Sequence, residues 1–223
     1  MFNLNYLIVK LLTVPGIIFA FSLRGYAQAF VAKKLGDDTP ERNGQLTMNP
    51  MAHIDLIGFL CILLLGIGWG KPVRTNSRNY KNIKRDSAIQ ILSGPAGLVF
   101  GGFALSFFFA LITYLNGYIF KNEIVDYLSD ILWYGMSTCL VLANFYLIPL
   151  PGLDGYNFIV NFLPYQTYRK LYSIEKYSMF IFLAFIILIN TTSILDFLLA
   201  PATFTLNSFM TLWDFLFGLI FKS

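Results

Sequence analysis

Long apolar runs separated by short polar stretches dominate the sequence. A helix needs about 20 largely apolar residues to cross a bilayer. Five runs approach or exceed this length, at residues 4–31, 87–114, 131–150, 178–200 and 204–221. A sixth run at 54–69 is short and rich in glycine at its end, so it either spans the bilayer or enters and returns. The pattern predicts an all-α, multi-pass membrane protein with a single domain over residues 1–223.

The composition excludes a soluble domain. Hydrophobic residues make up 57% of the chain and charged residues 13%, against about 25% charged residues in an ordinary globular domain. The mean hydropathy of +0.63 agrees with this, and 2 cysteines are too few for a disulfide scaffold. The net charge of +4 is small and the basic residues flank apolar runs. We therefore expect the lipid bilayer as a partner and no nucleic acid.

The charges of the loops indicate how the runs are oriented. Residues 71–86 are rich in lysine and arginine, whereas residues 121–130 hold three acids and one lysine. Residues 161–176 are basic again. Because cytoplasmic loops carry an excess of basic residues, we expect the first and third of these loops inside the cell and the second outside.

Proline and glycine mark two further regions. The polar stretch after the first run carries turn signals that are compatible with a short β-hairpin, at Pro40, Asn43-Gly44 and Asn49-Pro50. The run at 87–114 carries four glycines, Gly94, Gly97, Gly101 and Gly102. Such small residues favour a face for close helix packing rather than an ion path. Since the chain also shows no repeated halves, a transporter or channel is the weakest of the functions considered.

Five short motifs follow one another along the chain. They are Phe21–Phe30 (FSLRGYAQAF) with Leu35-Gly36-Asp37, Leu46–Asp55 (LTMNPMAHID), Gly68–Val73 (GWGKPV), Ser93-Gly94-Pro95, and Asn144–Gly155 (NFYLIPLPGLDG). In this order and spacing they resemble the site-2 protease family of intramembrane zinc metalloproteases. The resemblance covers nearly the whole chain, and the combination is far more specific than any one motif.

The resemblance implies a zinc site whose residues have changed in this chain. In that family two histidines of an H-E-x-x-H motif bind zinc, the glutamate is the general base, and the aspartate of a later L-D-G motif is the third ligand. Here the motif reads Arg24-Gly25-Tyr26-Ala27-Gln28, and Asp154 occupies the third position. A guanidinium has no lone pair for a metal, glycine has no side chain, and an amide oxygen suits hard cations better than zinc. We therefore expect no intact catalytic residue at Arg24, Gly25 or Gln28, and no cofactor.

Arg24 and Asp154 are expected to contact each other. A charge inside an apolar span is costly and usually has a partner, and the resemblance places Asp154 close to the altered motif. A guanidinium that replaces the metal cation can donate two hydrogen bonds to a carboxylate. The alternative is that Arg24 extends to the cytoplasmic interface while Asp154 is solvated.

The same pair constrains the topology. For Arg24 and Asp154 to meet, the first span and the span at 131–150 must end on the same, cytoplasmic side. The run at 54–69 then cannot cross, because the loop after it is cytoplasmic too, and we expect it to be re-entrant or interfacial. This gives about five transmembrane helices with the N-terminus outside. If the run crosses instead, there are six helices with the N-terminus inside.

Four more residues in these motifs are candidates for a groove or for a structural role. His53, the only histidine in the chain, is expected to brace the polar stretch through hydrogen bonds. Asn144 resembles a family asparagine near the catalytic centre. Together with Pro149 and Pro151 it either lines a groove that holds substrates or merely ends the helix and shapes the turn before Asp154.

The leading hypothesis is a catalytically inactive family member that binds transmembrane segments of client proteins, or an active family member, in a bacterial cell membrane. The alternative is an active intramembrane zinc metalloprotease with an atypical metal site. Such a site would use His53 and Asp154 with Cys61 or Cys139, although nothing in their spacing suggests it. Without a carboxylate at position 25, a bound water also lacks its general base, a loss of about 10²–10⁴-fold in rate.

Overall fold

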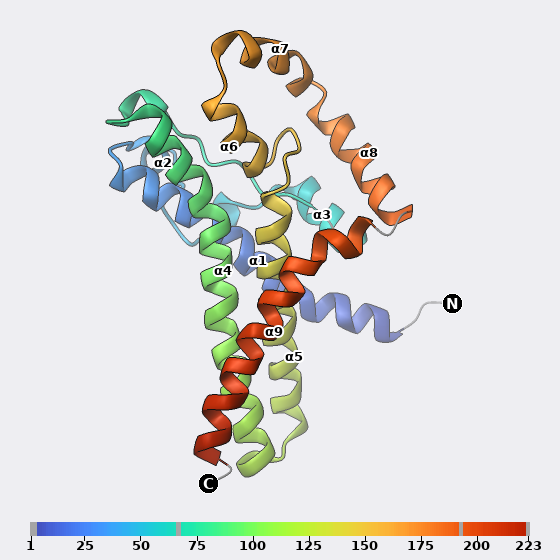
Figure 1. The fold of residues 1–223 in the computed structure, drawn as a ribbon. Coiled ribbons are helices and arrows are strands. Elements are labelled where there is room, and N and C mark those ends of the chain that lie inside the picture. The colour runs from blue at the N-terminus through green and yellow to red at the C-terminus, as the bar shows by residue number, and fades with distance from the viewer. Residues whose placement is uncertain (1–3, 66–67, 192–193, 222–223) are drawn as a thin grey trace.

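The computed structural model describes residues 4–65, 68–191 and 194–221, and these residues are mainly helical (Figure 1). The longest helices are α1 (Leu4–Lys34), α4 (Ile83–Leu115), α5 (Glu123–Tyr146) and α9 (Ile194–Phe221). The shorter helices are α2 (Thr39–Arg42), α3 (Leu56–Leu65), α6 (Asp154–Phe162), α7 (Tyr165–Glu175) and α8 (Ser178–Thr191). Single helical turns occur at Pro50–Ala52, Ser77–Asn79 and Asn116–Phe120. The described part of the chain contains no strand, which confirms the all-α fold class.

Three of the described helices are long and apolar enough to cross a membrane. They cover Ile8–Lys34, Ile83–Ile119 and Leu199–Ile220. The predicted span at 131–150 falls largely on α5, and the one at 178–200 covers α8 and the start of α9. The protein is therefore a helical membrane protein, and the number of passes stays a prediction.

Two expectations about local structure were wrong. The polar stretch after α1 forms α2 and a 3₁₀ turn instead of a hairpin, because Pro40 starts a helix readily in its first turn. Its one bridge among the described residues pairs Ile54 with Gly70. The boundary expected between the runs at 178–200 and 204–221 lies inside α9, which spans Ile194–Phe221. Pro201 is inside α9, and membrane helices tolerate an internal proline.

Helices α1, α4 and α5 cross so closely that only small residues fit at their contacts. A Cβ added at Gly16 on α1 would lie 2.6 Å from the Cα of Gly135 on α5. A Cβ at Gly97 on α4 would lie 2.7 Å from the Cβ of Ala27, and one at Gly101 would lie 2.3 Å from Leu23. These distances confirm that the glycines of α4 form a close packing face.

The segment that contains α3 doubles back on itself. Helix α3 has 10 residues, about 15 Å of helix, which is half the thickness of a bilayer core. Both ends of the segment lie together, because Ile54 pairs with Gly70 and the Lys71 amide donates to the His53 carbonyl over 2.7 Å. At the far end, Lys10 of α1 donates to the carbonyls of the last turn of α3. An ammonium is favourable there because it meets the negative end of the helix dipole.

A buried carboxylate ties the end of α1 to the loop before α4. Asp37 is completely buried and accepts hydrogen bonds from Thr39 Oγ1, the Asn76 amide and Asn79 Nδ2 at 2.5–2.7 Å. Burial alone raises the pKa of Asp37, but these hydrogen bonds hold it below the usual value. The contact fixes the loop that leads into the candidate site.

Candidate functional site

Arg24 and Asp154 form a bidentate ion pair at the centre of the fold. Arg24 is on α1 and is 6% exposed, and Asp154 is the first residue of α6 and is 4% exposed. Arg24 Nη2 lies 2.6 Å from Asp154 Oδ1, and Arg24 Nε donates to Oδ2 over 3.1 Å. The predicted contact is confirmed, and the alternative in which Arg24 extends to the interface is wrong.

Gln28 completes the contacts of the carboxylate. It lies one helical turn after Arg24 on the same face of α1, and its side-chain amide donates to Asp154 Oδ1 and to the Ile91 carbonyl, each over 3.2 Å. Asp154 also begins a helix, where the dipole favours negative charge. Both oxygens of the carboxylate are therefore engaged by donors from α1.

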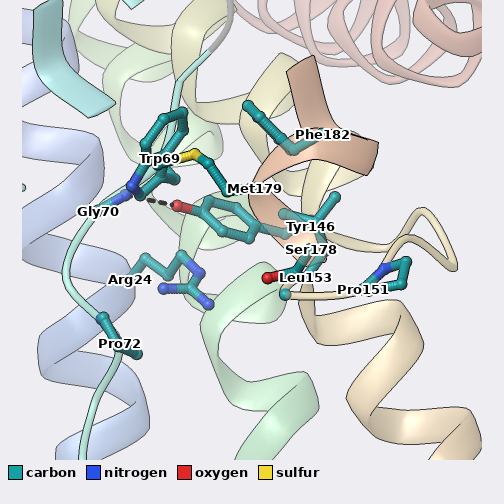
Figure 2. A pocket seen from close by; sticks show the side chains of 11 residues that line it. Arg24, Trp69, Gly70, Pro72, Tyr146, Pro151, Leu153, Ser178, Met179 and Phe182 are labelled. Atoms are coloured by element: carbon teal, nitrogen blue, oxygen red, sulfur yellow. Dashed lines mark hydrogen bonds between the residues drawn. The ribbon is translucent and has the colours of Figure 1, made fainter. Parts of the chain in front are cut away.

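Tyr146 contacts the Arg24 guanidinium with the face of its ring. The Cζ atom of Arg24 lies 3.7 Å from the centre of the Tyr146 ring, a cation–π contact in a desolvated setting. The Tyr146 hydroxyl accepts a hydrogen bond from the Gly70 amide over 3.0 Å (Figure 2). Sequence reasoning missed this residue, since its only signal was an aromatic side chain between the candidates Asn144 and Pro149.

The His53 ring occupies the space next to Gly25. A Cβ at position 25 would lie 2.1 Å from His53 Nδ1, so no larger side chain fits there without displacing the ring. His53 is 1% exposed, and its Nε2 donates to the Thr47 carbonyl over 2.7 Å. The histidine thus braces the polar stretch as predicted, while its Nδ1 is buried with no hydrogen-bond partner among the described residues.

The environment of His53 favours the neutral imidazole. Burial lowers the pKa of His53, the Thr47 carbonyl opposes this, and the positive charge of Arg24 lowers the pKa further. A neutral ring with Nε2 protonated leaves a lone pair on Nδ1. That lone pair points at the backbone of α1 where the altered motif lies.

The remaining candidates, Asn144, Pro149 and Pro151, have different surroundings. Asn144 donates to the Leu140 carbonyl of its own helix over 2.9 Å, so its side chain is held by α5 and not by the ion pair. Pro149 is exposed. Pro151 lines a cavity together with Arg24 and Tyr146.

Two cavities flank the ion pair, and Arg24 forms part of both walls. The first has a volume of about 250 Å³. Figure 2 shows Trp69, Gly70 and Pro72 on one side of it and Pro151 and Phe182 on the other. The second cavity, of about 630 Å³, is lined mainly by polar residues of α4, α6 and the loop before α4, and Gln28 and Asp154 also line it.

The aromatic ring of Phe182 covers the first cavity from α8. It meets Trp69 edge-on at 4.9 Å between ring centres and Phe145 at 5.8 Å. Trp69 belongs to the non-helical stretch after α3, and Phe145 belongs to α5. The first cavity therefore lies between three segments that are far apart in sequence, and its wall is mainly apolar.

The side chains at the altered motif do not match the donor set of a zinc site. The described residues contain no group of three histidine, cysteine, aspartate or glutamate side chains that could hold a metal. Arg24 carries a permanent positive charge where a ligand would be required. The Asp154 carboxylate is engaged by Arg24 and Gln28. Zinc needs at least three protein ligands with free lone pairs, and the altered motif with Asp154 does not supply them.

Comparisons with known proteins agree with the motifs. A relative from Bacillus subtilis (strain 168), named "Putative zinc metalloprotease YwhC", is 32% identical over 182 residues, which are 80% of this chain and 78% of the relative. "Putative zinc metalloprotease Rip2" from Mycolicibacterium smegmatis (strain ATCC 700084 / mc(2)155) is 27% identical over 198 residues, 86% of this chain and 71% of the relative. No family model matches the chain. No solved structure matches it either.

The helical membrane fold and the position of the altered motif define a metalloprotease-like membrane protein. The identity and coverage of the Bacillus relative make the assignment specific. The chain belongs to the site-2 protease-like family of zinc metalloproteases.

Proposed function

We propose that this chain is a catalytically inactive member of its family that binds a transmembrane segment of a client protein in an extended form. The observation that carries the proposal is the bidentate Arg24–Asp154 ion pair, 2.6 Å and 3.1 Å between its atoms. It occupies the positions where the family resemblance calls for two zinc ligands. The guanidinium thereby replaces the metal as the cation that Asp154 requires.

Three local features support the loss of catalysis. Position 24 offers donors only, position 25 has no side chain, and the space beside it holds the His53 ring. A general base must lie within about 3 Å of the water that it deprotonates. Among the described residues, the Asp154 carboxylate contacts the altered motif, and both of its oxygens already accept hydrogen bonds from Arg24 or Gln28.

The first cavity supports binding of an extended segment. The cavity of about 250 Å³ has a mainly apolar wall that can accept side chains of a transmembrane segment. An unwound segment places its side chains into such a space one at a time. Trp69, Gly70 and Pro72 form one wall in a stretch without helix, where Gly70 makes an isolated β-bridge with Ile54. Backbone of this kind can pair with an extended peptide.

A photo-crosslinking experiment tests this proposal. The full chain carries a photoreactive residue at Met179, which lines the first cavity, and is reconstituted in vesicles with a synthetic transmembrane peptide. One peptide has Asn-Pro at its centre so that it unwinds, and a matched peptide has Leu-Leu. We expect crosslinking of the Asn-Pro peptide at its intact mass and much less of the Leu-Leu peptide.

The controls separate binding from non-specific contact and from catalysis. The same photoreactive residue at Phe204, an exposed position on α9, should crosslink both peptides equally and weakly. Equal crosslinking of both peptides at position 179 would overturn the binding part of the proposal. Chelator-sensitive cleavage of the Asn-Pro peptide would overturn the inactive part.

The alternative function is an active metalloprotease with a displaced metal site. The observation in its favour is the buried His53 Nδ1, which has a lone pair and no hydrogen-bond partner in the described structure. A site at His53 and Asp154 would first require Arg24 to leave the carboxylate. The cleavage measurement above distinguishes the two functions directly.

A further inference from the structure

One face of α9 carries small and polar side chains where lipid is expected. The inner face of this helix packs on α4 and α5, with Ala202, Trp213 and Phe217 buried (Figure 1). A different face carries five exposed residues along the length of the span: Ala200, Thr203, Asn207, Thr211 and Asp214. Their spacings of 3, 4, 4 and 3 residues place all five on one stripe. We call these five residues the α9 seam.

Helix α9 is the most peripheral of the three span-like helices. Only 11% of its apolar window is buried, against 39% for α1 and 28% for α4. The seam is therefore open toward the bilayer in the described structure. A helix in this position would ordinarily present leucine, isoleucine or phenylalanine to lipid, as Phe204 and Phe215 do on its neighbouring face.

The polar groups of the seam are not all satisfied within the helix. The Thr203 and Thr211 hydroxyls donate to the carbonyls of Ala200 and Asn207 over 2.9 and 2.8 Å. No hydrogen bond from another described residue reaches the Asn207 amide or the Asp214 carboxylate. Asp214 lies six residues inside the end of the span, about 9 Å along the axis. A charge or an amide at such a depth marks a contact surface, because hydrocarbon offers no partner.

We propose that the α9 seam binds one transmembrane helix of a partner protein that carries a basic residue opposite Asp214 and an amide or hydroxyl residue opposite Asn207. This site is distinct from the client cavity and does not rest on the proposed function. Asn207 and Asp214 are seven residues apart, two turns of helix, so a partner with the same two-turn spacing meets both at once. Ala200 and the two threonines are small enough for close approach of the two backbones.

The charge of Asp214 favours a different protein over a second copy of this chain as the partner. Two copies in one bilayer have the same orientation, and a two-fold axis along the membrane normal places each seam residue opposite itself. Asn207 would pair well with its own copy, because an amide both donates and accepts. Asp214 would face a second carboxylate in a medium of low dielectric constant, which is unfavourable. A lysine or arginine on the partner removes this conflict.

Energy transfer in vesicles tests the proposal with defined probes. The full chain carries a donor dye, and three synthetic leucine-rich transmembrane peptides carry an acceptor. The first peptide has Asn and Lys seven residues apart, the second has Asn and Glu, and the third has leucine at both positions. We expect the Asn/Lys peptide to associate about tenfold more tightly than the leucine peptide, and the Asn/Glu peptide to gain nothing.

Matched variants show whether the seam is the binding surface. Asp214→Asn should remove most of the preference for lysine, and Asn207→Leu should weaken binding of the Asn/Lys peptide further. Ser208→Leu is the control, because Ser208 is exposed on another face and its hydroxyl donates to the Phe204 carbonyl. Equal association of all three peptides would overturn the proposal. So would self-association of the chain that Asn207→Leu abolishes, because a second copy would then be the occupant.

Discussion

Breaking the buried Arg24–Asp154 ion pair from one side should be among the most destabilising single changes in this protein. The perturbation is Arg24→Met, which keeps an unbranched apolar side chain but removes the charge. It leaves the Asp154 carboxylate buried, with only the Gln28 amide as a side-chain donor. The matched perturbation from the other side is Asp154→Leu, which leaves the guanidinium buried against Tyr146.

The burial of the two side chains gives the magnitude. They are 8% and 6% exposed, and removal of one partner from a buried pair costs about 3–5 kcal/mol, because an uncompensated charge stays in a medium of low dielectric constant. Replacement of both partners by apolar residues is often nearly neutral. The double variant should therefore be more stable than either single variant, and a double-mutant cycle should show a large coupling energy.

The chain also offers an internal control. Lys33 and Glu41 form an ion pair whose side chains are 40% and 45% exposed. Exposed pairs contribute about 0–1 kcal/mol. Lys33→Met should thus have little effect on the free energy of unfolding, although it removes the same kind of charge pair from the same helix.

Unfolding in mild detergent provides the assay. The protein is titrated with sodium dodecyl sulfate while tryptophan fluorescence is recorded, since the chain has 3 tryptophans and Trp69 lies in the wall of the first cavity beside Arg24. A loss below about 1 kcal/mol for both Arg24→Met and Asp154→Leu would refute the reasoning. It would place the pair in a hydrated setting like that of Lys33 and Glu41.

Three further predictions concern Gly25, His53 and Lys10. Gly25→Ala should cost about 1–3 kcal/mol because its Cβ would collide with His53, and the cost should shrink in a His53→Ala background; the same unfolding titration measures both. Burial holds the pKa of His53 in the folded protein below the unfolded value of 6.5. The neutral imidazole therefore contributes stability that is present above pH 6.5 and is lost as the pH falls through the folded pKa. His53→Gln should flatten this pH dependence of the free energy of unfolding, measured between pH 7.5 and 5. Lys10→Met removes the donor at the last turn of α3 and should speed hydrogen exchange there with little change in α5, whereas equal exchange in α3 would contradict the dipole argument.

A contact was predictable from sequence where its absence would cost much free energy. A permanent charge in an apolar span must find an opposite charge, and the family resemblance indicated where that charge lies, so the contact of Arg24 with Asp154 could be expected. The glycines of α4 were predictable as a packing face for the same reason, since small residues in membrane helices mark close approach.

Contacts without such a requirement could not be predicted. The contacts of Tyr146 with the guanidinium and of His53 with Gly25 depend on how segments far apart in sequence approach one another. No local pattern in the sequence indicates either contact. Asn144 was a candidate for the groove because of its motif, but its side chain is satisfied one turn back in its own helix. The boundary expected between the runs at 178–200 and 204–221 falls inside α9, which continues through Pro201.

Zinc content per chain tests the central claim most directly. The protein is purified in mild detergent without a metal-affinity tag, and zinc is measured by elemental mass spectrometry against the protein concentration. With Arg24 in the place of the metal, we expect zinc near zero, unchanged by added zinc followed by dialysis. One zinc per chain that is lost in Asp154→Asn or His53→Gln would contradict the account, because these residues would then form a metal site in spite of the ion pair.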